Sequence, residues 1–256
     1  MGRRYLEIVQ VRRVAYLRLI SRERFNTLHR DCIREIKTAL EQLEREDQIA
    51  CIVITGDPGE SFAVGANIVE MKDFTSRQAW DFACLGQALF SYMEGLSKPI
   101  IGALNGITMG GGCDLALACD IRLASDRLKL AHPGAKLGII TGFGGTQKLP
   151  RLVGRNKAKE IFMTSQVYSA EECLECGLVE QVFPATQFMD EVAVYAERIA
   201  SQPPMALDLV KKLLNAAEDV AIEQGQIMEI GAFSSLFPRQ GRMEKMEDFF
   251  SEHGSD

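Results

Sequence analysis

Hydrophobic residues along the first hundred positions follow two different spacings. Residues 5–20 alternate apolar and polar side chains around Arg12-Arg13, which predicts a β-hairpin. After a polar loop, the spacing changes to that of an amphipathic helix ending near residue 46, with apolar positions at Leu28, Cys32, Ile36, Leu40 and Leu43. A strand over 50–55 and a helix over 76–97 follow.

Strands and helices keep alternating beyond residue 97. Apolar runs predict a strand just before Asn105 and another over 120–125. From about residue 154 the pattern becomes mainly helical, with a short strand near 178–182 and helices near 155–164, 169–175, 186–201, 204–218, 220–236 and 240–250. Repeated alternation favours an α/β fold with parallel sheets over an all-helical or all-β fold.

The stretch from Ile100 to Asp120 carries the first indication of chemistry. An apolar run ends in Asn-Gly, passes through three consecutive glycines and enters a segment that favours helix. Glycines at a helix start let backbone N–H groups approach a ligand at the positive end of the helix dipole. Asp114 follows Gly111 by nearly one helical turn, so a polarising donor and an acid/base group would converge. Close packing and helix capping are the alternative explanation of the same residues.

A second stretch, Ser61 to Met71, repeats this pattern after the strand over 50–55, with small residues before a short helical segment. Together the two stretches resemble the enoyl-CoA hydratase/isomerase family, the crotonase superfamily. The likeness extends to Gly142–Gly154 and to Ala170–Val179. It implies a crotonase-like spiral of ββα units with a C-terminal helical region.

The resemblance also assigns roles to individual residues. Ala66 and Gly111 would supply backbone N–H groups to the thioester oxygen, and Asp114 would be the acid/base carboxylate. The remaining matches are to positions that bind the acyl-CoA substrate, with Arg24 toward the phosphates and the others along the coenzyme and acyl group: Arg24, Val64, Asn67, Ile68, Gly110 and Gly134.

The chain departs from the family at its second acid. A typical hydratase of the family has a glutamate where this chain has Gly134, and an alternative carboxylate position of the family is Gly142 here. We therefore expect an enoyl-CoA hydratase, or a double-bond isomerase, that uses the single carboxylate Asp114. The alternatives are decarboxylation or C–C bond cleavage of a cyclic or branched acyl-CoA, and a coenzyme-A-binding protein without turnover. His132 is a candidate base, or shapes the loop before Pro133.

The expected organisation is an α/β core with the acyl-CoA site over residues 1–190 and a helical trimerisation region over residues 191–256. By resemblance, the protein would assemble as a homotrimer or a dimer of trimers. An apolar stripe through Leu207, Val210 and Leu214 fits this expectation.

The amino-acid composition limits which classes of binding partner and cofactor remain possible. The 256 residues carry a formal net charge of −6, which argues against broad binding to nucleic acids or anionic membranes, although Lys211-Lys212 is one basic pair of the kind RNA binding uses. Seven cysteines, an odd number, are expected to be reduced packing residues, and Cys173 and Cys176 to lie within a helix. The three histidines are dispersed, so no metal is expected and coenzyme A enters only as part of the substrate. Without an apolar leader or spanning segment, the expected location is the cytoplasm.

Overall fold

The computed structural model describes residues 5–20, 25–56, 60–238 and 240–253. Its strands form two sheets. The larger sheet has six strands in the order β1 (Leu6–Val11), β2 (Val14–Leu19), β3 (Cys51–Gly56), β5 (Ile100–Leu104), β7 (Ile121–Ser125) and β10 (Gln181–Phe183). The smaller sheet has four strands in the order β4 (Ser61–Ala63), β6 (Ile107–Met109), β8 (Lys129–Ala131) and β9 (Tyr168–Ser169).

Consecutive strands are distributed between the two sheets in a repeating way. In each of the pairs β3–β4, β5–β6 and β7–β8, the first strand joins the larger sheet and the second joins the smaller one. Neighbouring strands from successive pairs run parallel, as β3 with β5 and β4 with β6 do. This arrangement confirms the predicted α/β spiral of ββα units.

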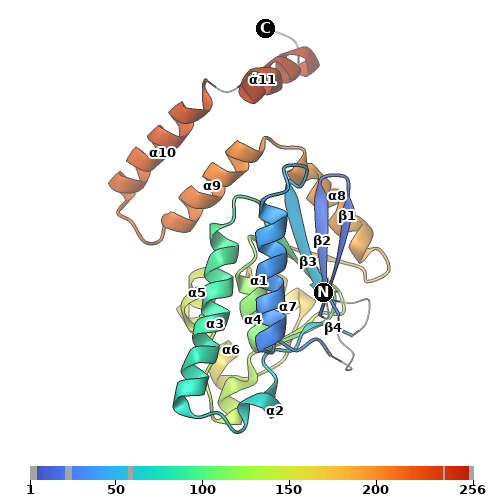
Figure 1. The fold of residues 1–256 in the computed structure, drawn as a ribbon, viewed down its shortest axis with the longest axis vertical. Helices are drawn as coiled ribbons and strands as arrows, with labels where there is room; N and C mark the ends of the chain where they lie inside the picture. Colours follow the sequence, from blue (N-terminus) through green and yellow to red (C-terminus); the bar gives the residue numbers. More distant parts are fainter. Residues whose placement is uncertain (1–4, 21–24, 57–59, 239, 254–256) are drawn as a thin grey trace.

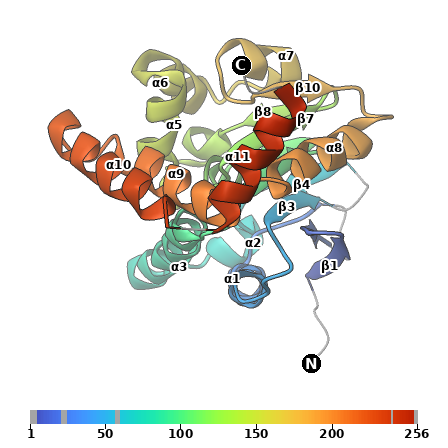
Figure 2. The same ribbon diagram turned by 90° about the horizontal axis from the view of Figure 1, so that it is seen from above.

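Helices cover both faces of the larger sheet (Figures 1 and 2). Alternate residues of β3 belong to two different cores, because successive strand side chains point to opposite faces. Ile52 and Ile54 pack with α1 (Arg30–Glu44) and α3 (Ser76–Gly95), whereas Cys51 and Val53 pack with α8 (Phe188–Ala200). The predicted hairpin and the helix ending near residue 46 are both confirmed.

Short elements account for most differences from the sequence expectation. Strands β4, β6, β8 and β9 each have three residues or fewer, too few to show a period. The short helix expected after the small residues is α2 (Ile68–Met71), and the helix after the triple glycine is α4 (Gly111–Leu117). A 3₁₀ turn, η1 (Pro133–Leu137), and α5 (Gly145–Val153) were not expected, and the short strand near 178–182 is β10.

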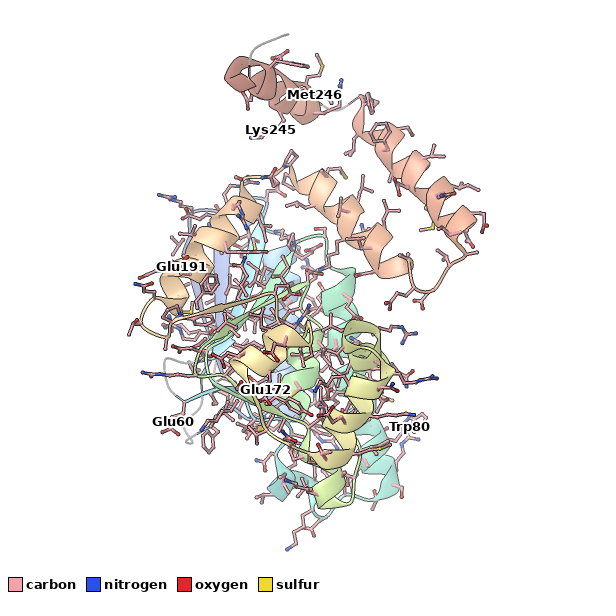
Figure 3. The ribbon with its side chains drawn as sticks, turned by 180° about the vertical axis from the view of Figure 1, so that it is seen from behind. Glu60, Trp80, Glu172, Glu191, Lys245 and Met246 are labelled. Atoms are coloured by element: carbon pink, nitrogen blue, oxygen red, sulfur yellow. The ribbon has the colours of Figure 1, made fainter. Side chains whose placement is uncertain are left out.

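The last part of the chain is helical, as predicted, through α6 (Arg155–Thr164), α7 (Ala170–Glu175), α8, α9 (Pro204–Ala216), α10 (Ile222–Leu236) and α11 (Gln240–His253). The boundary expected between residues 190 and 191 falls inside α8, yet Phe188, Val192 and Ala200 of this helix all pack on the larger sheet. Only α9, α10 and α11 extend away from the two sheets (Figure 1). Lys245 and Met246 mark α11 at the far end (Figure 3).

The cysteines are reduced, as the sequence predicts, but Cys84 is exposed instead of packed and Cys176 lies just past the end of α7. All seven are free thiols, and Cys32, Cys51, Cys113, Cys119 and Cys173 are buried. Within the described ranges, no three metal-ligating side chains gather into a cluster that could hold an ion. No helix in the same ranges has the length and apolar character needed to cross a membrane.

Candidate active site

Three parallel strands of the smaller sheet bring three loops to one edge. Strand β6 pairs in parallel with β4 on one side and with β8 on the other, so their carboxyl ends lie together. The loop after β4 carries Gly65-Ala66, the loop after β6 carries Gly110-Gly111, and the residue after β8 is His132. Ligand sites commonly form at such an edge.

The first two loops are in close contact because both lack side chains there. Gly65 has φ +86°, and a Cβ atom on it would lie 2.9 Å from the Gly111 nitrogen. Gly110 has φ +51°, a conformation that glycine adopts readily, and it turns the chain from β6 into α4. Within the described residues, the N–H groups of Ala66 and Gly111 donate to no acceptor. Two free donors therefore stand in adjacent loops.

Asp114 lies in the first turn of α4 with its side chain fully buried. Its Oδ1 is 3.1 Å from Nε2 of His132, and its Oδ2 accepts a hydrogen bond from the hydroxyl of Thr141. A Cβ atom at Gly145 would lie 2.0 Å from Oδ1, so this carboxylate fits only beside a glycine. Both oxygens of Asp114 thus lie within hydrogen-bond distance of side chains from other parts of the chain, His132 after β8 and Thr141 after η1.

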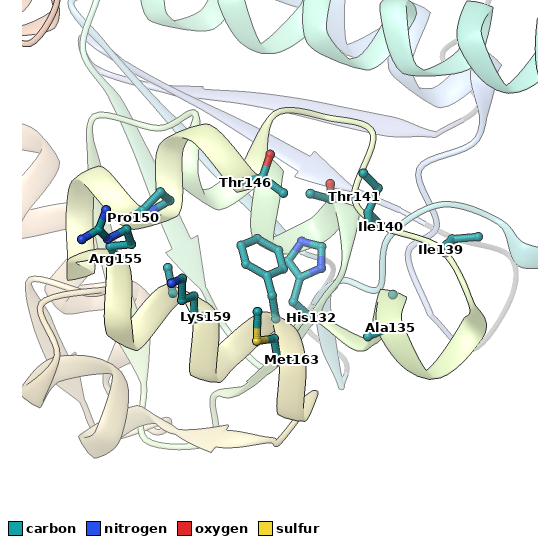
Figure 4. A pocket seen from close by; sticks show the side chains of 13 residues that line it. His132, Ala135, Ile139, Ile140, Thr141, Thr146, Pro150, Arg155, Lys159 and Met163 are labelled. Carbon is teal, nitrogen blue, oxygen red and sulfur yellow. The ribbon is translucent and has the colours of Figure 1, made fainter.

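His132 connects this buried carboxylate to a cavity. The side chain is 2% exposed, and its Nδ1 has no hydrogen-bond partner within the described part of the chain. Its ring centroid lies 4.6 Å from that of Phe162. The ring, Thr141 and Gly134 line a cavity of about 410 Å³ (Figure 4). The other walls are mainly apolar, with two cations, and include Ala135, Ile139, Ile140, Phe162, Met163, Arg155 and Lys159.

Cys113, the neighbour of Asp114, is excluded as a nucleophile. Its thiol donates to the carbonyl oxygens of Ala131, at 3.1 Å, and Thr108, at 3.3 Å. Burial, followed by the nearby Asp114 charge, raises the pKa of this thiol well above its usual range. The thiolate needed for nucleophilic attack is therefore not formed.

Of the predicted substrate-binding residues, Val64 and Asn67 lie in the loop after β4 and Ile68 begins α2. The N–H group of Val64 donates to Asn26 O at 2.8 Å, and Ile68 is 58% exposed. The side-chain oxygen of Asn67 caps α2 by accepting from Val69 N at 2.9 Å and Glu70 N, so it already has a structural task. Arg24 lies outside the described residues.

Three residues at the site were not predicted from the sequence. Thr141 and Gly145 contact Asp114, and buried Asn26 holds the loop after β4 through the carbonyl oxygens of Ser61 and Phe62, each at 3.2 Å. Thr141 directly precedes the alternative acid position Gly142, and a Cβ at Gly142 would instead meet Ala83 of α3 at 3.1 Å. The glycines on either side of Phe143, at 142, 144 and 145, were the sequence feature that marked this loop.

Comparison with known proteins agrees with this geometry. The sequence profile described as enoyl-CoA hydratase/isomerase matches residues 10–255. A crotonyl-CoA hydratase of Syntrophomonas wolfei is 38% identical over 224 residues, covering 88% of this chain and 86% of the relative. A short-chain-enoyl-CoA hydratase of Clostridium acetobutylicum is 35% identical over 237 residues, covering 93% of this chain and 91% of the relative. The crystal structure of an enoyl-CoA hydratase from Bacillus anthracis superposes with a TM-score of 0.94 at 31% identity, covering 97% of each chain. The chain therefore belongs to the enoyl-CoA hydratase/isomerase family, the crotonase superfamily.

Proposed function

We propose that the protein is an enoyl-CoA hydratase that adds water to a short-chain α,β-unsaturated acyl-CoA. The observation that carries the proposal is the pair of N–H groups of Ala66 and Gly111, which lack an acceptor in the described ranges and stand in adjacent loops beside buried Asp114. The names of the relatives from Syntrophomonas wolfei and Clostridium acetobutylicum support a short acyl chain.

The two donors suit the charge that develops during water addition. Attack at the β-carbon pushes electrons onto the thioester oxygen, and this oxygen becomes an enolate. N–H groups fixed in position before the reaction stabilise that charge, and losing one such donor costs about 3–4 kcal/mol of barrier in other enzymes. Ala66 and Gly111 serve through their backbones, so small side chains keep the thioester close to both nitrogens.

The acid/base chemistry is centred on Asp114. Gly134 contributes no side chain to the cavity, so it leaves room for the acyl group. Val64, Asn67, Ile68 and Gly110 would line the path of the coenzyme, and Arg24 would meet its phosphates. No cofactor is needed, because coenzyme A arrives with the substrate.

We further propose that the active enzyme is a cytoplasmic homotrimer, or a dimer of trimers. The support is the apolar character of α10, which has no buried residue in the single chain and exposes Ile227, Ile230 and Phe233.

Incubation of the purified protein with crotonyl-CoA in heavy water tests the activity. Mass spectrometry should find a product heavier by one water, with deuterium at the α-carbon. Asp114→Asn should lower kcat about 100-fold or more, because general acid/base catalysis typically contributes at least that much. Asp190→Asn, on the exposed first turn of α8, is the matched control and should keep the wild-type rate.

The product mass separates the competing reactions. Isomerisation of a β,γ-unsaturated acyl-CoA leaves the mass unchanged, and decarboxylation lowers it. Tight coenzyme A binding without any product or α-deuteration across straight-chain, cyclic and branched substrates would contradict the proposal and indicate a binding protein.

A further inference from the structure

The structure pairs Asp114 with a second titratable group, His132. His132 follows β8, Asp114 lies in α4, and their side chains meet at 3.1 Å in the interior. We infer that His132 is the group that exchanges protons with the substrate, while Asp114 orients its ring and stabilises the imidazolium that forms. This inference rests on the proposed hydratase function and names the residue that replaces the acid absent at Gly134.

The proposal assigns one tautomer to His132. Nε2 carries the proton and donates to Oδ1 of Asp114, since an ionised carboxylate only accepts hydrogen bonds. In the neutral ring the other nitrogen, Nδ1, then holds the lone pair. Nδ1 is buried and has no partner in the described chain, a costly state for a polar atom unless something else meets it. Because the ring lines the cavity, a ligand in the cavity is the partner we assign to it.

The pair is held rigidly on every side. The hydroxyl of Thr141 occupies the second oxygen of Asp114, and Phe143 N donates to that hydroxyl oxygen at 3.2 Å. Phe162 packs against the imidazole ring, and Gly145 leaves clearance for Oδ1. A base fixed in this way loses little freedom when it acts on a bound molecule.

A complete reaction cycle through His132 conserves atoms and charge. Nδ1 takes a proton from water as the water oxygen bonds to the β-carbon, and the electrons of the C=C bond move onto the thioester oxygen held by Ala66 and Gly111. The imidazolium, paired with the Asp114 carboxylate, then gives the same proton to the α-carbon as the enolate returns to the thioester. The sum is one water added, and His132 ends neutral as it began.

A structural role for His132, shaping the loop before Pro133, makes different predictions. Replacement by asparagine would then lower stability or substrate affinity and leave turnover of the bound substrate near the wild-type value. A proton-transfer role instead places the loss in kcat. It also allows a free base that enters the cavity to replace the missing ring.

The test uses crotonyl-CoA hydration by the full-length protein carrying His132→Asn or His132→Gly. We expect kcat to fall about 100-fold or more, KM to change less than threefold, and added imidazole to restore the glycine variant at least tenfold. His29→Asn is the matched control, because His29 caps α1 by accepting from Cys32 N, packs against the Tyr5 ring and does not line the cavity, and asparagine caps equally well.

Two results would overturn the inference while leaving the hydratase standing. One is a His132→Asn enzyme within threefold of the wild-type kcat. The other is a His132→Gly enzyme that stays folded by thermal melting and circular dichroism but gains nothing from imidazole. Failure of the wild-type protein itself to hydrate crotonyl-CoA contradicts the proposed function instead, so the two claims fail separately.

Discussion

Gly145 controls the position of the carboxylate at the centre of the site without touching a substrate. A Cβ atom there would lie 2.0 Å from Oδ1 of Asp114 and 3.3 Å from a methyl group of Thr141. Neither neighbour can move away easily, because Asp114 is fully buried and hydrogen-bonded through both oxygens. The position of the Asp114 carboxylate therefore depends on residue 145 having no Cβ atom.

We predict that Gly145→Ala lowers kcat for enoyl-CoA hydration at least tenfold, because Asp114 must rotate away from His132. Misplacement of a catalytic group by about an ångström commonly costs that much or more. Gly95→Ala is the control, since a Cβ at Gly95 meets nothing within 4 Å. Equal kcat values for the two variants would show that Asp114 is free to move.

The sequence identified some of these residues and missed others for one physical reason. Gly111 and Asp114 are neighbours within one helix turn, so local spacing indicated them, whereas the role of Ala66 was implied by the family resemblance. The contact of Asp114 with Thr141 spans 27 positions, and its contact with His132 spans 18. Such contacts arise only when strands β6 and β8 pair, and no local pattern encodes them.

At the scale of elements, one buried lysine attaches α9 to the core. Lys211 is the only buried residue of that helix. Its ammonium donates to the carbonyl oxygens of Met93, at 2.9 Å, and Lys98, at 3.3 Å, and pairs with Asp120 at 2.9 Å. Burial raises the pKa of the Asp120 carboxyl despite the neighbouring ammonium. Lys211 is therefore not available for RNA, and only Lys212 of this basic pair is exposed.

Lys211→Met should lower the free energy of unfolding by about 2–4 kcal/mol, because it leaves the largely buried Asp120 carboxylate without its ammonium partner and with the N–H of Ile100 as its remaining donor. Lys212→Met should cost less than about 1 kcal/mol, since Lys212 is exposed and pairs only with Asp208 on the same helix. Urea unfolding followed by circular dichroism measures both. The double variant Lys211→Met with Asp120→Asn should recover part of the loss, and equal losses for the two lysine variants would contradict the network.

Long elements were predictable more often than short ones. The helices from α6 to α11 were expected close to their observed positions, and all of them except the six-residue α7 are long enough to display a helical period, although the nine-residue α5 was missed. Strands β4, β6 and β8, which build the site, have three residues each and carry no period of their own. Their pairing comes from the repeated ββα connection and not from the local sequence.

At the scale of the whole molecule, thiols are distributed through both cores. Burial raises the pKa of Cys32, Cys51, Cys119 and Cys173 to about 12, from an ordinary value of 9.0. The folded protein keeps these protons while the unfolded chain releases them. This contribution to stability is complete below about pH 9 and is lost as the pH rises toward 12.

Under reducing conditions, the free energy of unfolding should fall between pH 9 and 11 by up to about 1.4 kcal/mol per pH unit for each buried thiol. Cys51→Ala should reduce the slope of the free energy of unfolding against pH by the contribution of one thiol. Cys84→Ala, at an exposed position, should leave it unchanged. Identical slopes for Cys51→Ala and the wild type would mean that the interior admits water to this thiol.

The helices that extend from the core govern assembly in the proposed trimer. Ile227, Ile230 and Phe233 are 71%, 68% and 63% exposed on α10, an arrangement typical of a surface covered by another chain. We predict that Ile230→Glu combined with Phe233→Glu converts the assembly to a species of the single-chain mass, 28.4 kDa, in sedimentation experiments. Val194→Glu, which alters an exposed apolar residue on α8, should leave the assembly intact. A wild-type protein that sediments as a single chain would contradict the proposed trimer.

Gly134 has a consequence for protein engineering. A Cβ atom at this position would lie 3.0 Å from the carbonyl oxygen of Ile139, so any side chain here requires that carbonyl to shift by a few tenths of an ångström. Installing a glutamate therefore needs a small adjustment of the loop from η1 toward α5 as well as the exchange itself. A second substitution in this loop that relieves the contact would have to accompany the glutamate in a two-glutamate design.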